Sequence, residues 1–329
     1  MIESKAQVEE AAARIAALRD EIGRVIVGQH HVVEQLLWCL LAGGHALLEG
    51  IPGLGKTMLI RTLADCVALQ FSRIQFTPDL MPSDITGTTL IDFSTQGNAA
   101  QRFQPGPLFG NLVLADEINR ATPKTQSALL EAMQEGTVTA GGETHRLPKP
   151  FFVLATQNPI EQEGTYPLPE AQLDRFLLKI GVEFPTREEL KQIVLRTTSA
   201  SQANANAIMS AAELTELQMV AKQILVAEEM LDWAVKTVMM SHPQESDAPD
   251  EVKRFVRYGA GPRALQAIIS VSKVRALASG RLHVTWQDIR HTAMPVLRHR
   301  IVLSYEAQAM GLTTDRMTEA ILAVLEAER

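Results

Sequence analysis

The sequence predicts an α/β fold with a parallel sheet, followed by a smaller helical domain. Two observations support this prediction. Over the first part of the chain, short apolar runs alternate with helical patterns, which is typical of a parallel sheet covered by helices. From Arg187 onward the apolar periodicity is mostly helical. We therefore expect a boundary at Pro185 and Thr186, with an α/β domain in residues 1–186 and a helical domain in residues 187–329.

The expected elements follow one another along the chain in a simple order. The first domain is predicted to contain helices at 5–22, 30–42, 58–69, 122–135 and 169–176, and strands at 45–49, 71–76, 111–117, 151–155 and 177–184. The second is predicted to contain helices at 188–197, 212–226, 228–241, 263–279, 286–297 and 314–328. Each prediction rests on apolar residues recurring every three or four positions for helices, or on short apolar or alternating runs for strands.

Segment 77–110 interrupts the alternation with many prolines and glycines. Within it, residues 88–93 and 99–103 are predicted to pair as a hairpin. Such a long connection in a compact domain is usually functional or an insertion. A second hairpin is expected in residues 137–147, turning over Gly141-Gly142.

Composition narrows the class of protein. Of 329 residues, 46% are apolar and 21% charged, which is ordinary for a soluble globular protein. The net charge of −7 argues against a general nucleic-acid coat, which usually carries a basic face. We expect no signal peptide, no membrane insertion and a cytoplasmic location, because the longest apolar stretch is short and interrupted by glycine. Cys39 and Cys66 lie in apolar helical patterns and are expected to be buried thiols.

The most specific motif is Gly-Ile-Pro-Gly-Leu-Gly-Lys-Thr at residues 50–57, which fits the phosphate-binding pattern G-x-x-x-x-G-K-[ST]. A predicted strand precedes it and a predicted helix follows it, as the motif requires. Its glycines allow the backbone N–H groups to surround a phosphate at a helix N-terminus. Lys56 is expected to reach the β- and γ-phosphates, and the Thr57 hydroxyl to bind Mg²⁺. The expected nucleotide contacts in this stretch are Gly50, Pro52, Gly53, Leu54, Gly55, Lys56, Thr57 and Met58.

Polar residues also follow two later strands. Asp116 and Glu117 close a strand of apolar residues, so they should lie at the ligand edge of the sheet. Asp116 is expected to hold Mg²⁺, and Glu117 to orient and deprotonate the attacking water. Asn158 follows the next strand and could hold this water near the γ-phosphate. The alternative is ordinary turn chemistry, because Asn158 precedes Pro159.

Two arginines are candidates for phosphate contact. Arg175 lies between a short predicted helix and a strand, and Arg263 opens a helix of the second domain. The planar guanidinium suits a phosphate well, although a surface ion pair is the alternative for both residues.

The ordered set of these motifs resembles an AAA+ ATPase, and the residues at 50–57, 76–87, 115–121, 155–159 and 164–176 are similar to those of the MoxR family. The resemblance covers nearly the whole chain. It implies that residues 50–57 are Walker A, Asp116-Glu117 Walker B, and Asn158 sensor 1. It also implies that residues 77–110 contain the helix-2 insert and residues 136–147 the hairpin before sensor 1.

The resemblance further assigns residues outside the first motifs. Arg175 would be the arginine finger that reaches a neighbouring subunit's nucleotide, with Arg120 as a second candidate. Arg263 would be sensor 2 on the helical lid and would contact the γ-phosphate of its own subunit. Gly28 and Gln29 would lie by the adenine. The implied cofactors are ATP and Mg²⁺.

The MoxR resemblance implies an ATP-hydrolysing chaperone that remodels, assembles or activates a client protein complex. It also implies a partner with a von Willebrand factor A (VWA) domain and a homo-oligomer, commonly a hexameric ring. The alternatives are a magnesium-chelatase-type motor subunit and a nucleic-acid translocase similar to MCM helicases. The acidic net charge disfavours the translocase, because tracking a nucleic-acid backbone requires basic grooves. A polymerase-remodelling activator is disfavoured by the absence of a G-A-F-T-G-A loop, and a non-hydrolysing scaffold by the presence of Glu117.

Overall fold

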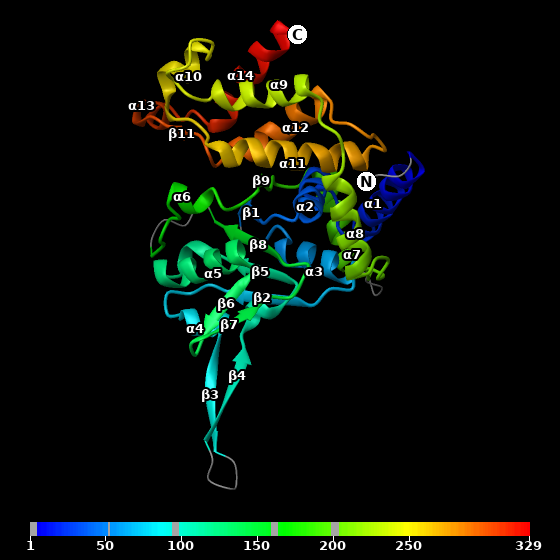
Figure 1. Cartoon of the computed structure of the whole chain (residues 1–329), viewed down its shortest axis with the longest axis vertical. Coiled ribbons are helices and arrows are strands. Elements are labelled where there is room, and N and C mark those ends of the chain that lie inside the picture. Colours follow the sequence, from blue (N-terminus) through cyan, green and yellow to red (C-terminus); the bar gives the residue numbers. More distant parts are fainter. Residues whose placement is uncertain (1–4, 52, 94–98, 159–163, 199–203) are drawn as a thin grey trace.

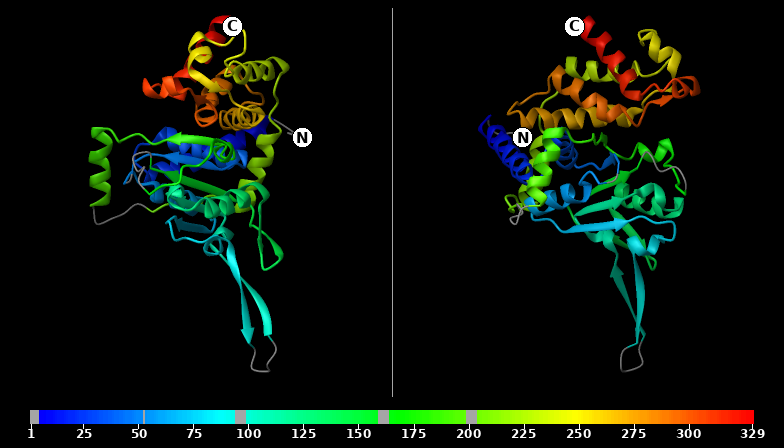
Figure 2. Two further views of the ribbon diagram at one scale, coloured as in Figure 1. Left: turned by 90° about the vertical axis from the view of Figure 1, so that its left-hand side faces the viewer. Right: turned by 180° about the vertical axis from the view of Figure 1, so that it is seen from behind.

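The computed structural model describes residues 5–51, 53–93, 99–158, 164–198 and 204–329. The chain forms an α/β body with a layer of helices on one side and a long hairpin projecting from the opposite side (Figures 1 and 2). The predicted fold class, a parallel α/β core followed by a helical lid, is confirmed.

The body is built on a five-stranded sheet with the strand order β2-β5-β8-β1-β9. Every neighbouring pair is parallel. The strands are β1 (Ala46–Glu49), β2 (Phe71–Gln75), β5 (Leu112–Asp116), β8 (Phe152–Gln157) and β9 (Leu178–Gly181). Because β5, β8 and β1 are adjacent and parallel, their carboxyl ends lie at the same edge of the sheet. Ligands bind at such an edge in open α/β sheets.

Two hydrophobic clusters cover the two faces of the sheet. Successive side chains of a strand point to opposite faces, so Leu48 joins one cluster and Leu47 the other. The first cluster contains α1 (Lys5–Val25), α2 (His30–Ala42) and α3 (Lys56–Cys66), and it continues into the helical layer. The second contains α5 (Pro123–Glu135) and α4 (Pro82–Thr86). Cys39 and Cys66 are buried and free, as expected.

After β9 the described chain is mostly helical. Helices α7 (Arg187–Thr197) and α8 (Ala211–Lys222) lie beside the body, and the rest form the helical layer (Figure 1). That layer contains α9 (Glu228–Met239), α10 (Asp250–Phe255), α11 (Pro262–Ala278), α12 (Trp286–Leu297), α13 (Tyr305–Ala309), α14 (Thr314–Glu328) and the short ribbon of β10 (Val256–Tyr258) and β11 (Val302–Leu303).

After β9, the predicted elements differ from the structure in two respects. The helix predicted to reach residue 226 ends at Lys222, because Leu225 leaves the helix to form a β-bridge with His283. The short elements α10, α13, β10 and β11 were not predicted, since two to six residues are too few to show a period.

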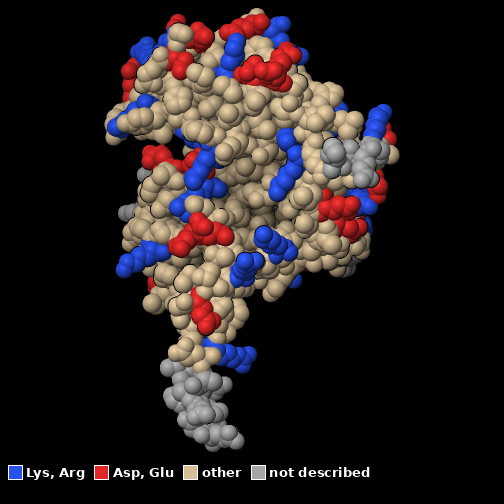
Figure 3. All heavy atoms as spheres, in the orientation of Figure 1, with Lys and Arg blue, Asp and Glu red and all other residues tan. Residues whose placement is uncertain are grey.

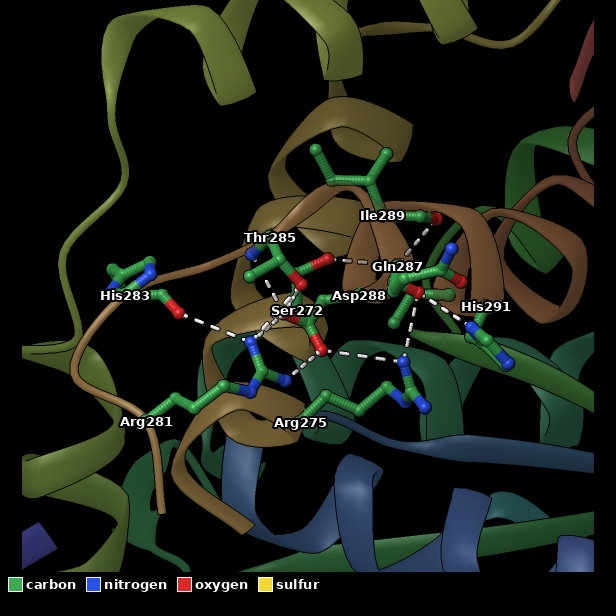
Figure 4. A network of polar contacts seen from close by, with 10 residues as sticks. Ser272, Arg275, Arg281, His283, Thr285, Gln287, Asp288, Ile289 and His291 are labelled. Carbon is green, nitrogen blue, oxygen red and sulfur yellow. Dashed lines mark hydrogen bonds and ion pairs between the residues drawn. The ribbon is translucent and has the colours of Figure 1, made fainter. Parts of the chain in front are cut away.

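A buried carboxylate organises the part of the layer that touches α2 (Figure 4). Asp288 is fully buried and accepts two 2.7 Å hydrogen bonds from Arg281, plus bonds from the backbone N–H and hydroxyl of Thr285. Arg275 also approaches Asp288, at 3.4 Å, and its guanidinium lies 5.3 Å from the centre of a Trp38 ring. Since Trp38 belongs to α2, this cluster ties the helical layer to the body.

Both predicted hairpins are present. The projecting one consists of β3 (Gly87–Phe93) and β4 (Ala99–Pro105), and its predicted tip at 94–98 lies outside the described residues. The other consists of β6 (Thr137–Ala140) and β7 (Glu143–Arg146). The Phe103 ring stacks on His145 with 3.8 Å between centroids. The two hairpins therefore pack together at their bases.

Among the described residues, no helix combines the length and the apolar character needed to cross a bilayer.

Candidate active site

The loop between β1 and α3 has the backbone of an anion-binding turn. Gly53 and Gly55 adopt φ values of +85° and +74°, which strain any residue with a side chain. Gly55 is also the N-cap of α3, and no side chain caps this end of the helix. The first N–H groups of α3 are therefore free to bind a phosphate. Pro52, one of the expected contacts, lies outside the described residues.

Lys56 lies at the first position of α3 and points back to the loop, where its Nζ donates to the carbonyl oxygen of Gly50 over 2.9 Å. Partial burial lowers the pKa of Lys56, whereas the charges of Asp116 and Glu117 act to raise it. The structure thus brings the predicted lysine and both predicted acids into one electrostatic site. Thr57 follows in the first turn of α3 and is partly exposed, as is Met58.

Asp116 ends β5 with both carboxylate oxygens engaged. The Thr156 hydroxyl of β8 donates to Oδ1 over 2.7 Å, and an Nη2 group of Arg73 on β2 donates to Oδ2 over 2.7 Å. The Thr156 hydroxyl also accepts the backbone N–H of Glu117 over 2.8 Å. Thr156 therefore positions both acids.

Glu117 has a left-handed backbone with φ of 57°, which is rare for a residue with a side chain and is common at functional sites. Its Oε2 accepts a 2.9 Å hydrogen bond from the side-chain amide of Gln75, and an Nη1 group of Arg120 lies 3.3 Å away. The exposed Arg120 thus pairs with Glu117 of its own chain.

Sequence reasoning missed Arg73, Gln75 and Thr156. A signal was present for the first two, because residues 73 and 75 are polar positions on one face of a strand that pairs with β5. Thr156 gave no signal, since a threonine inside an apolar strand is ordinary. Asn158 follows β8 directly and is buried at 5% exposure, so it lies at the sheet edge where it was expected.

A cavity of about 710 Å³ opens beside the loop. Its lining is largely apolar, with a few polar groups, as is usual for a small-molecule site. It is lined by Val25, Ile26, Val27, Gln29, Gly53, Leu54, Gly55, Met58, Arg61, Thr62, Asp65, Phe184, Pro185, Leu190, Ile193, Arg196, Thr197, Asn204 and Ala205. The side-chain amide of Gln29 donates to the carbonyl oxygen of Leu54 over 3.0 Å. Gly28 does not line the cavity. Gly28 has a φ of +65°, and a Cβ there would meet the side chain of Glu189 on α7.

Arg175 and Arg263 lie elsewhere. The Arg175 Nη1 group donates to the carbonyl oxygen of Leu130 on α5 over 2.8 Å, and Arg175 lines a separate cavity of about 390 Å³. Arg263 opens α11, with Nη1 3.6 Å from an oxygen of Asp174. Neither arginine lines the 710 Å³ cavity. Helix α6 (Glu170–Leu173) and the adjoining end of α11 lie on the opposite side of the molecule from α3 and α7 (Figures 1 and 2). Within one chain, Arg263 is therefore placed beside Asp174, the residue before Arg175, and not in the cavity next to the P-loop.

The charge of the surface is unevenly distributed. Figure 3 shows Lys and Arg side chains around a hollow in the middle of one face, although the chain carries a net charge of −7. Local basic character of this kind is compatible with an anionic ligand.

The residues present fit a magnesium nucleotide. The free N–H groups at the start of α3 and Lys56 suit phosphate oxygens, and the hydroxyl of Thr57 and the carboxylate of Asp116 are the hard oxygen donors that Mg²⁺ prefers. Glu117 is a second, separately held carboxylate at the same edge. This division of tasks is what hydrolysis of a phosphoanhydride requires.

Comparisons with known proteins agree with this geometry. A family model described as "ATPase family associated with various cellular activities (AAA)" matches residues 45–178, and one described as "AAA lid domain" matches residues 250–321. Chaperone MoxR1 of Mycobacterium tuberculosis is 46% identical over 302 residues, covering 92% of this chain and 79% of that protein. Protein MoxR of Methylorubrum extorquens is 29% identical over 327 residues, covering 93% of this chain and 92% of that protein. A crystal structure of a candidate ATPase from Cytophaga hutchinsonii superposes with a TM-score of 0.90 at 40% identity, covering 97% of this chain and 96% of the other.

Proposed function

The chain belongs to the MoxR family of AAA+ ATPases, and we propose that it uses Mg²⁺-dependent ATP hydrolysis to remodel or activate a protein complex. The observation that carries the hydrolytic part is the convergence of Lys56, Asp116 and Glu117 at the edge of the sheet, where Thr156 holds both acids. The family and the candidate ATPase of 40% identity support the same reaction.

The roles of the residues follow from their contacts. The loop N–H groups and Lys56 bind the phosphates, and the 710 Å³ cavity receives the base and sugar. Thr57 and Asp116 would hold Mg²⁺, which when bound supplies positive charge to the phosphate oxygens. Glu117 accepts a proton from the attacking water, and Asn158 orients this water. The side-chain amide of Gln75 holds Glu117 by donating a hydrogen bond to one of the carboxylate oxygens of Glu117.

A neighbouring copy of the chain completes the site in this proposal. A stabilising arginine is useful only if it reaches the transferring phosphoryl group. The distance of Arg175 and Arg263 from the cavity of their own chain supports action on the nucleotide of the next subunit, and Arg120 remains a further candidate for such contact. A head-to-tail arrangement that closes gives a ring, for which we propose six subunits.

The two hairpins are the elements that would contact a client or partner protein. The β3–β4 hairpin projects from the body (Figure 1), and its base is stacked on the β6–β7 hairpin through Phe103 and His145. The β6–β7 hairpin in turn follows α5 and precedes β8, which carries Thr156 and leads to Asn158. A change at the nucleotide can therefore reach a projecting element that is suited to contact a partner. We propose a VWA-domain protein as this partner and a protein complex as the client.

Substitution of Glu117 tests the catalytic assignment. The Glu117→Gln variant should retain ATP binding while its turnover falls by roughly 10²–10⁴, the usual contribution of a general base. The Lys56→Ala variant should lose tight ATP binding. Glu229→Gln, an exposed change in the first turn of α9, serves as the matched control and should hydrolyse ATP like the unmodified protein. Turnover of Glu117→Gln equal to that of the control would refute the assignment.

A further inference from the structure

Arg73 belongs to none of the sequence motifs, yet it contacts Asp116, the candidate metal ligand. On β2 it alternates with Ile74, which is buried at 4%, so Arg73 and Gln75 share the other face of the strand. The backbone of Gln75 is in register with that of Asp116 on β5. This register brings the Arg73 guanidinium to the Asp116 carboxylate, with Nη2 2.7 Å from Oδ2.

The contact brings a full positive charge to the atom that would bind a cation. The Asp116 side chain is only 13% exposed, whereas that of Arg73 is 46% exposed. The carboxylate is thus held by Thr156 at Oδ1, whereas the guanidinium borders solvent and has room to move away once its own hydrogen bonds break. A guanidinium and a divalent cation at one carboxylate oxygen repel each other. Binding of the divalent cation is therefore linked to departure of Arg73.

The same guanidinium is connected to the candidate base. The Nη2 group of Arg73 also donates to Oε1 of Gln75 over 2.8 Å, and Nε2 of Gln75 donates to Oε2 of Glu117 over 2.9 Å. Arg73 therefore fixes the orientation of the Gln75 amide, and this amide holds Glu117. Departure of Arg73 removes one of the two restraints on Gln75.

We propose that Arg73 is a positioning residue that competes with Mg²⁺ for Asp116, so that Arg73 must leave this carboxylate when Mg²⁺ binds there. The inference rests on the proposed function, because it requires Mg²⁺ at Asp116.

The test measures how strongly Mg²⁺ assists nucleotide binding. The probe is the fluorescent nucleotide mant-ADP, and the quantity is the ratio of its dissociation constant in EDTA to that in saturating Mg²⁺. The intrinsic affinity of Mg²⁺ for the nucleotide is the same for every variant, so it cancels when ratios are compared. Removing the competing charge in Arg73→Gln should raise the ratio about tenfold. Arg73→Lys keeps the positive charge that repels Mg²⁺ and should remain within about twofold of the unmodified protein.

The controls separate this role from a structural one. Arg254→Gln removes an exposed arginine that pairs with Glu306 in the helical layer, and it should leave the ratio unchanged. Circular dichroism and thermal unfolding establish that each variant is folded. A ratio that stays constant or falls in folded Arg73→Gln would overturn the inference, because Arg73 would then be neutral or would support Asp116. A ratio of one in the unmodified protein would instead refute the Mg²⁺ site, and the inference with it.

Discussion

The side-chain amide of Gln75 donates to Glu117 Oε2 over 2.9 Å, which joins the end of β2 to the candidate base at the end of β5. Glu117 is already constrained by its left-handed backbone and by the bond from its N–H to Thr156. The orientation of this carboxylate is therefore determined by the neighbouring strands β2 and β8 and not by β5 alone.

Removing the Gln75 amide should release the base. Gln75→Leu keeps the bulk but cannot donate to Glu117, so the carboxylate becomes free to turn to the water. We expect basal ATP turnover to rise about threefold, which corresponds to the lower range of a single hydrogen bond. A steady-state assay at saturating ATP and Mg²⁺ measures it. Slower turnover in this variant would show that Gln75 holds Glu117 in its productive orientation.

A site shared between subunits should be recoverable by mixing defective chains. Lys56→Ala lacks the phosphate lysine and Arg175→Ala lacks the in-trans arginine, so each is expected to be inactive alone. In mixed rings, some interfaces combine an intact P-loop with an intact arginine. Activity should therefore return on mixing, measured as ATPase against the mixing ratio. If mass measurements confirm mixed rings and no ratio restores activity, Arg175 does not act in trans.

The same mixing experiment shows whether Arg263 acts on the nucleotide of its own subunit or on that of the neighbouring subunit. Arg263 is placed next to Asp174, the residue before Arg175. If it serves the neighbouring subunit, mixing Lys56→Ala with Arg263→Ala should restore activity as the Arg175 mixture does. If Arg263 contacts the γ-phosphate of its own subunit, the only chains with an intact lysine lack the arginine, and the mixture stays inactive. The two mixtures are compared at equal total protein.

Stability should fall in mild acid because of a buried histidine. The His45 imidazole lies between the carbonyl oxygen of Met133 and the N–H of Val153, at 3.0 Å from each. Burial lowers its pKa to about 4, partly opposed by the bond to Met133. The unfolded chain, with an ordinary histidine pKa near 6.5, binds this proton more readily. The contribution of neutral His45 to the free energy of unfolding is thus complete above about pH 6.5, and it is lost progressively as the pH falls toward 4.

His45→Gln removes this titration while keeping a polar side chain. Urea unfolding at several pH values should show a slope between about pH 6 and 4.5 that is flatter by roughly 1 kcal/mol per pH unit, close to the limit for one proton. His299 is also buried with a lowered pKa, and it contributes in the same direction in both proteins. An unchanged slope would show that His45 is not the titrating group.

The sequence by itself determined the order of elements, the parallel sheet and the position of the main site residues. The P-loop, Asp116-Glu117 and Asn158 could be predicted because each lies in or directly after a strand, and parallel strands end at one edge. The hairpins at 88–103 and 137–147 could be predicted because paired strands and their turns are local in sequence.

Tertiary structure alone decided how the site residues are held and where the two arginines lie. Arg73, Gln75 and Thr156 reach the acids only because β2 and β8 flank β5, and strand order is a non-local property that no local pattern encodes. The position of Arg263 beside Asp174 depends on how the helical layer packs on α1 and α2. The sequence Gly261-Pro262-Arg263 identifies the start of a helix, but the packing of the helical layer determines which phosphate Arg263 can reach.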